Sequence, residues 1–261
     1  EEDESIYGIY FFLAETYRKT DSQTNSLFYY KKALVLLLKD QKKIIDDNLI
    51  NFDNEKLTKL YLKIGNNYLS SGKVDSAKIF YNKTFNTPSL SPKSLASKAS
   101  AYSNLAGIYM LDSIYDLAKN YSLKSIEIHA KLNNKISEAV AFGSLASIYL
   151  SEDNFNKAKE TYKKALDIIK NLESDRALRV RENLYYNLAY NLYKLEDHEA
   201  YTYQERSYII KDSLRDKEIR KIIEELGFKY NFESKKEIFD KEVENKRLKA
   251  QRTYIAIGLV A

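Results

Sequence analysis

Side chains suited to catalysis or metal binding are scarce in this chain. Its 261 residues contain no cysteine, which excludes thiolate metal sites, disulfides and cysteine nucleophiles. The two histidines, His129 and His198, are far apart in sequence, and the seven glycines form neither a dinucleotide fingerprint nor a phosphate loop. We expect His129 in a helix and His198 in a turn, both at the surface. The sequence therefore predicts no catalytic residue, no metal site and no cofactor.

A row of polar residues is the stronger candidate for binding a ligand. A side-chain amide offers two donors and an acceptor, so successive asparagines can hydrogen-bond an extended peptide backbone without demanding a particular sequence. Asparagine is a modest helix former, so its recurrence in helical segments calls for an explanation. The alternative is that these side chains simply solvate an open groove. The candidate partner-binding residues are Lys63, Asn66, Asn104, Ser144, Asn187 and Asn191.

Composition points to a helical scaffold. Hydrophobic residues make up 44% of the chain, while there are 7 Gly and 2 Pro, too few for a turn-rich sandwich. Forty-two Lys and Arg against 37 Asp and Glu give a net charge of +5 with both signs well mixed. Nucleic-acid binding would need a clustered basic excess, so we expect no nucleic-acid partner.

The elements that must position the polar row come from an internal repeat. An aromatic residue is followed by Leu or Ile, then Gly or Ala, then Tyr, and after a turn by further small and aromatic residues. Large residues three and four apart form one apolar stripe, and the small residues allow two helices to approach closely, so each copy predicts an antiparallel helix pair. The alternative is a non-repeating bundle of amphipathic hairpins. The copies begin at Tyr10, Tyr61, Tyr102, Phe142 and, in degenerate form, Tyr185.

This pattern resembles the tetratricopeptide repeat, which implies an all-α, right-handed α-solenoid whose first helices line a concave groove for a protein or peptide. The Leu or Ile of the later copies recurs every 40 to 43 residues, and Leu13 and Ile64 are 51 apart. The usual period is about 34, so we expect second helices longer by one or two turns and an inserted loop near 41–57. The expected pairs, within 7–215, are 7–40, 58–91, 99–132, 139–172 and 182–215.

Some proteins of this family clamp a C-terminal carboxylate with Lys, Asn and Arg from three successive first helices. Asn66 and Asn104 match the two asparagines of such a clamp. Leu62, Val140 and Ser144 occupy the positions of its basic residues. The sequence therefore does not predict a complete clamp.

The carboxy-terminal part has a different character. Over 216–252 charges of alternating sign accompany a weak apolar seam, which predicts a long charged helix that pairs in a homodimer or folds back on the repeats. The apolar residues 253–261 are too few to span a bilayer, which takes about 20, and we interpret them as the start of a transmembrane helix. An ordinary helix end with an apolar tip is the alternative.

Lys211-Asp212-Ser213-Leu214 and the charged stretch 229–236 resemble a family of membrane-bound regulators of the Bacteroidetes type. That resemblance implies an inner-membrane anchor, a periplasmic repeat region and a histidine kinase or helix-turn-helix output. Four cations just before the apolar tail favour a cytoplasmic location instead. We therefore expect a non-catalytic, protein- or peptide-binding sensor domain of a membrane-anchored signalling protein, with a cytosolic adaptor as the alternative.

Overall fold

The computed structural model describes residues 2–46 and 54–258, and their side chains over 6–39 and 54–245. Within these ranges the chain forms ten α-helices and no strand, so the predicted all-α fold is confirmed. The helices are α1 (Glu2–Lys19), α2 (Gln23–Asp46), α3 (Asn54–Ser70), α4 (Val74–Asn86), α5 (Pro92–Leu111), α6 (Tyr115–Lys131), α7 (Lys135–Ser151), α8 (Phe155–Ile169), α9 (Asp175–Lys194) and α10 (Glu199–Gly258).

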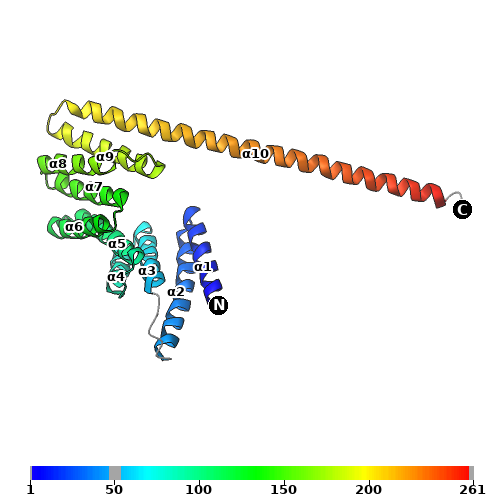
Figure 1. The fold of residues 1–261 in the computed structure, drawn as a ribbon, viewed down its shortest axis with the longest axis horizontal. Helices are drawn as coiled ribbons and strands as arrows, with labels where there is room; N and C mark the ends of the chain where they lie inside the picture. Colours follow the sequence, from blue (N-terminus) through cyan, green and yellow to red (C-terminus); the bar gives the residue numbers. More distant parts are fainter. Residues whose placement is uncertain (1, 47–53, 259–261) are drawn as a thin grey trace. The chain divides into compact units, whose positions relative to one another are not determined.

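The chain divides into two compact units, Glu1–Ser207 and Tyr208–Ala261, and α10 contributes to both. In the first unit the helices form successive antiparallel pairs, from α1–α2 to α7–α8 (Figure 1). The first turns of α10 pack on α9, where the rings of Tyr185 and Tyr203 are 5.7 Å apart. Helices α5, α7 and α9 each contact both helices of the preceding pair, which is the stacking of a repeat array.

The same turn joins the two helices of every pair. Its middle residue has a positive φ, as at Gly72 (71°) and Asp153 (56°). The backbone N–H of the next residue donates to a carbonyl five residues earlier, as from Lys73 to Tyr68 (2.9 Å), which closes a Schellman motif. In the first four pairs the accepting carbonyl belongs to the last tyrosine of the repeat pattern, and in α9 it belongs to Leu192. A repeated turn gives each second helix the same exit direction.

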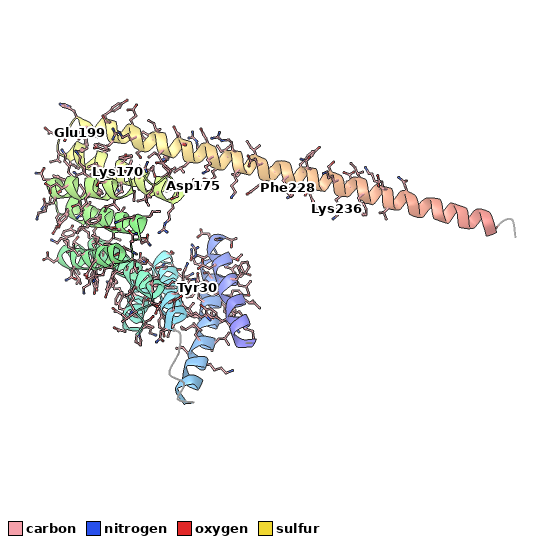
Figure 2. The ribbon with its side chains drawn as sticks, viewed as in Figure 1. Tyr30, Lys170, Asp175, Glu199, Phe228 and Lys236 are labelled. Carbon is pink, nitrogen blue, oxygen red and sulfur yellow. The ribbon has the colours of Figure 1, made fainter. Side chains whose placement is uncertain are left out.

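Aromatic rings and small residues hold the pairs together. In the second pair the ring of Phe80 lies between those of Tyr61 (6.1 Å) and Tyr68 (5.5 Å), and the first and third pairs repeat this arrangement. At Gly65 an added Cβ would lie 2.7 Å from Cε1 of the Tyr81 ring. The predicted close approach at the small positions is thus present, and Figure 2 marks Tyr30, the equivalent of Tyr81, inside the first pair.

The repeats are longer than the usual length of about 34 residues, and the extra residues do not all lie in the second helices, where we expected them. The second helices α4, α6 and α8 have 13, 17 and 15 residues, whereas the first helices α5 and α9 have 20 each. Both α5 and α9 begin with a serine N-cap, at Ser91 and Ser174, which starts these helices early. Among the second helices α2 is long, with 24 residues, so the prediction that every second helix is lengthened holds for α2 but fails for α4 and α8.

The expected inserted loop near 41–57 is also narrower than the sequence suggested. Helix α2 continues to Asp46 and α3 begins at Asn54, so 41–46 and 54–57 are helical. Residues 41–46 contain no Gly or Pro to end the helix. The centre of the expected loop, 47–53, lies outside the described residues.

The second helix of the last pair and the expected charged helix 216–252 are parts of one helix. Helix α10 is continuous over 60 residues, because this stretch contains no proline and its internal glycine, Gly227, is tolerated in a helix. Of the expected transmembrane start, 259–261 lie outside the described residues. Over the described part of the chain, no helix is both long enough and apolar enough to cross a bilayer.

Candidate functional site

A cavity of about 550 Å³ lies on the first helices of the first three pairs. Three of the predicted binding residues, Lys63, Asn66 and Asn104, line it. We call this cavity the groove site. Its complete lining is Arg18, Asp21, Gln23, Lys63, Asn66, Asn67, Leu69, Ser70 and Asn104.

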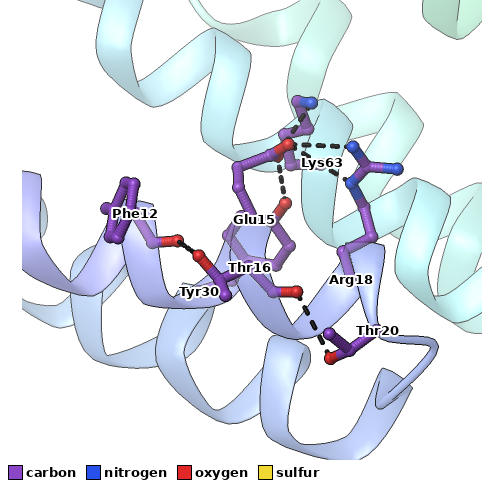
Figure 3. Close-up of polar contacts among 7 residues, drawn as sticks. All are labelled: Phe12, Glu15, Thr16, Arg18, Thr20, Tyr30 and Lys63. Atoms are coloured by element: carbon purple, nitrogen blue, oxygen red, sulfur yellow. Dashed lines mark hydrogen bonds and ion pairs between the residues drawn. The ribbon is translucent and has the colours of Figure 1, made fainter. Parts of the chain in front are cut away.

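A carboxylate on α1, that of Glu15, orders the cationic side of the groove site (Figure 3). Lys63 Nζ lies 2.8 Å from Glu15 Oε1, Arg18 Nη2 lies 3.0 Å from Oε2, and the Tyr30 hydroxyl donates to Oε1. Burial alone would raise the pKa of Glu15, but the hydrogen bonds from Lys63, Tyr30 and Arg18 lower it to about 2. Glu15 is therefore ionised at neutral pH and fixes two cations at the cavity wall.

Two asparagines from neighbouring helices form the polar floor of the groove site. Asn66 Oδ1 accepts from the Tyr81 hydroxyl (3.0 Å) and from Asn104 Nδ2 (2.7 Å). Asn104 Nδ2 also donates to the Tyr81 hydroxyl (3.2 Å), so the two amides and this hydroxyl form one closed network. These bonds leave the Asn66 NH₂ group as a donor and the Asn104 Oδ1 as an acceptor. One donor beside one acceptor is the complement of the C=O and N–H of one residue in an extended chain, which point to the same side.

The hydroxyl of a buried tyrosine supports the groove face in three repeats, each time from 15 residues downstream. Tyr30 bonds Glu15, Tyr81 bonds Asn66, and Tyr162 Oη lies 2.8 Å from Ser147 Oγ. The sequence analysis included these tyrosines only among the aromatic residues that follow the turn of each repeat and missed this role. It also missed Glu15 and Arg18. A polar residue paired with a tyrosine 15 positions later is the signal that could have found Glu15.

The other predicted binding residues lie away from the groove site. Ser144 Oγ donates to the Val140 carbonyl of its own helix (3.1 Å), and Asn187 is half-buried on α9. Asn191 is 0% exposed, and its amide donates to the Phe155 carbonyl (3.0 Å). Asn191 therefore joins two repeats and is not available to a ligand, contrary to the sequence-based expectation, because it lies on the helix face covered by α8.

Asn67 makes the same kind of contact at the first junction between repeats. Its amide donates to both the backbone carbonyl and the side-chain oxygen of Gln23, each at 3.1 Å. In the third and fourth repeats the equivalent position holds Ile108 and Ile148, both buried. This position at the junction between repeats therefore holds a buried asparagine in the second and fifth repeats and a buried isoleucine in the third and fourth.

The predicted surface position of His129 is wrong. Its side chain is 3% exposed, in the last turn of α6, and burial lowers its pKa below the usual value. Arg176 lowers that pKa further, whereas Glu138 raises it. His198 is exposed, as expected. The repeat spacing placed His129 in a helix but could not show that α7 packs against that helix.

Comparison with known families identifies the repeats. Two family models described as "Tetratricopeptide repeat" match this chain, one at residues 97–171 and the other at 7–35 and 58–84. The chain is therefore a tetratricopeptide-repeat protein. The resemblance to the tetratricopeptide repeat, which was inferred from the pattern of tyrosine, leucine and alanine, is confirmed. No curated protein sequence matches the chain.

Solved structures share the fold. BtubC (BKLC) from P. vanneervenii has 17% identity and a TM-score of 0.60, over 82% of this chain and 93% of its own. The apo form of RapI has 18% identity and a TM-score of 0.63, over 82% and 73%. The Rap conjugation gene regulator of plasmid pLS20, solved in complex with the Phr* peptide, has 15% identity and a TM-score of 0.53, over 80% and 54%. At these identities the similarity establishes the fold alone.

Proposed function

We propose that this chain is a non-catalytic repeat array whose groove site binds an extended peptide segment of a partner protein. The observation that carries the proposal is the pair of unused amide groups on Asn66 and Asn104. An extended peptide presents a carbonyl and an N–H at each residue, and these two groups can bond one such unit from the groove side. The Rap regulator solved with a peptide is a precedent for peptide binding on this fold.

The groove site carries charges of both signs. Its two cations, Arg18 and Lys63, lie near two carboxylates, that of Glu15 and that of Asp21 in the cavity lining. Glu15 already positions both cations, so a polar group of the peptide does not have to order them. This arrangement differs from the clamp of the family, because the cations come from α1 and α3 and not from the position of Val140 on α7.

The test is a selection from a random dodecapeptide library on the full chain, followed by anisotropy titration of a labelled selected peptide. We expect Asn104→Ala to weaken binding about tenfold, since a hydrogen bond in a partly closed site is worth roughly 1 kcal/mol or more. The matched control is Ser144→Ala, because Ser144 bonds its own helix. Equal affinity of the wild type and Asn104→Ala would refute the assignment of the groove site, provided that the melting temperature shows the variant to be folded.

We also propose that the array is the sensor region of a membrane-anchored signalling protein. The support is the sequence resemblance at Lys211–Leu214 and the apolar residues 253–261. Expression of the complete gene product, followed by membrane fractionation and protease accessibility, tests this proposal. Recovery in the soluble fraction would favour the cytosolic adaptor instead.

A homodimer through α10 is a further part of this proposal. Its support is the apolar seam of Ile219, Ile223, Leu226 and Tyr230, whose side chains are all exposed on α10. Burying such side chains against a second copy removes apolar surface from water. Sedimentation equilibrium of the full chain should give a dimer, and Leu226→Asp should give a monomer. A wild-type monomer at all concentrations would contradict the proposal.

A further inference from the structure

A second cavity, of about 500 Å³, lies at the other end of the repeat array from the groove site. It is formed by α9, the turn after it and the first turns of α10, close to Glu199 in Figure 2. We call it the tyrosine pocket. Its lining is Tyr186, Ala189, Tyr190, Tyr193, Asp197, His198, Ala200, Tyr201 and Gln204.

Aromatic side chains dominate the walls of the tyrosine pocket. Tyr186, Tyr190 and Tyr193 follow one another at four- and three-residue intervals on α9, so their Cα atoms rise by about 6 and 4.5 Å along one face. Tyr193 and Tyr201 remain 70% and 74% exposed. Buried tyrosines elsewhere in the chain pack inside the pairs, whereas these present their rings and hydroxyls to solvent.

The tyrosine pocket is not shaped to receive another helix pair. On α7 the positions 43 residues earlier are Gly143 and Ser147, in place of Tyr186 and Tyr190. Gly143 lets α9 approach so closely that an added Cβ would lie 2.8 Å from Cδ2 of Leu184. A tyrosine at that position blocks the same approach. A further stacked repeat, from this chain or a second copy, is therefore disfavoured.

The charges exclude several other ligands. Among the described residues no Lys or Arg belongs to the lining of the tyrosine pocket, and the single lysine at its rim, Lys194, falls short of the cluster of cations that anionic lipid headgroups and nucleic acids need. The acid in the lining, Asp197, is already bonded to Lys159 (2.6 Å), and that bond and the Glu199 backbone N–H lower the pKa of Asp197. Lys194 lies at the rim with its ammonium 5.5 Å from the centre of the Tyr190 ring. The lining therefore suits an uncharged ligand with hydrogen-bond acceptors.

We propose that the tyrosine pocket binds a proline-rich, polyproline-II segment of a partner. Such a segment has flat apolar pyrrolidine rings to pack on tyrosine rings, and its backbone carbonyls have no internal hydrogen bonds. The tyrosine hydroxyls and the Lys194 ammonium can donate to those carbonyls. Aromatic-lined grooves recognise proline-rich segments in this way because the ligand is extended before it binds. The pocket is separate from the groove site, and its occupancy does not depend on the function proposed for that site.

The test is an anisotropy titration of the full chain with fluorescein-labelled decaproline, with a labelled glycine–serine decapeptide as the comparison ligand. Decaproline should bind saturably, and the glycine–serine peptide should not. Tyr193→Ala and Tyr201→Ala should each weaken binding by about tenfold or more, as expected for aromatic contacts in a small site. Phe228→Ala, which removes an exposed aromatic ring outside both the tyrosine pocket and the apolar seam of α10, should have no effect.

Three results would overturn the proposal. They are no saturation with decaproline up to millimolar concentration, unchanged affinity in Tyr193→Ala, and loss of decaproline binding in Asn104→Ala. The last result would mean that the peptide occupies the groove site, so the proposed function would stand while the tyrosine pocket would not. Conversely, if the chain binds decaproline but fails to bind any library peptide at the groove site, the proposed function of the groove site fails and the tyrosine pocket stands. Because Tyr193 and Tyr201 are mostly exposed, circular dichroism should show both variants folded.

Discussion

Replacing Gly65 by alanine tests the close contact that holds the second helix pair together. The new Cβ would lie 2.7 Å from Cε1 and 2.8 Å from Cδ1 of Tyr81. Ordinary van der Waals contact begins near 3.4 Å, so the ring or the helix must move by several tenths of an ångström. The Tyr81 ring is fully buried, and hydrogen bonds to Asn66 and Asn104 hold its hydroxyl, so it cannot rotate away freely.

The expected change in the free energy of unfolding is the sum of two opposing effects. Overpacking a well-filled contact costs roughly 1–3 kcal/mol, while alanine in place of glycine within a helix gains about 1 kcal/mol. We expect a net loss of about 1 kcal/mol, which is limited because Ala14 and Ala146 occupy the same position in other repeats, against Tyr30 and Tyr162. A loss of that size lowers the melting temperature by about 2–4 °C for a chain of this length.

The matched control is Gly107→Ala. Gly107 is a helical glycine in the next first helix, and an added Cβ there meets no atom within 4 Å. This variant should gain about 1 kcal/mol from helix propensity alone. Urea unfolding followed by circular dichroism measures both. Equal stabilisation of the two variants would show that the contact between Gly65 and Tyr81 is not tight, and the argument from close approach would fail.

Three further predictions concern buried polar groups. Asn191→Ile removes the bond to the Phe155 carbonyl, but it also removes a buried amide oxygen that has no partner and adds apolar burial of the kind found at Ile148, so it should stabilise the fold by about 1 kcal/mol; a lower melting temperature would contradict this. His129 has a lowered pKa in the folded state, so the free energy of unfolding should fall as the pH drops below 6.5. The urea midpoint should fall with it in the wild type, and His129→Gln should show a smaller fall over the same pH range. Glu15 contributes stability that is present above pH 4.5 and lost as the pH falls through about 2, so the difference in urea midpoint between wild type and Glu15→Gln should shrink over that range.

Much of the architecture could be predicted from the sequence because equivalent residues recur in each repeat and each copy therefore predicts the same pair of helices. The recurrence of tyrosine, leucine and alanine predicted paired helices, and the small residues predicted where the helices touch. Helix lengths could not be read in the same way. Serine N-caps at Ser91 and Ser174 extend α5 and α9 at their starts. The spacing between repeats gives only the total number of residues in a repeat, so it does not show which of the two helices contains the extra residues.

The sequence named part of the lining of the groove site, whose role in binding stays a proposal. Lys63, Asn66 and Asn104 lie where the register of the first helices predicted, because that register fixes which side chains face the groove. Glu15 was missed, since its role depends on Lys63, which is 48 positions later in sequence but within hydrogen-bond distance in space.

What the amino-acid sequence determined by itself was periodic: the helix pairs, the small contact positions and the groove-facing register. What the tertiary structure alone decided was which polar side chains remain exposed once the pairs are stacked. Stacking buried His129 and Asn191 and left Tyr186, Tyr190 and Tyr193 of α9 open to solvent. The physical reason is that local periodicity fixes the direction of a side chain on its own helix, whereas its exposure depends on which neighbouring helix covers that face.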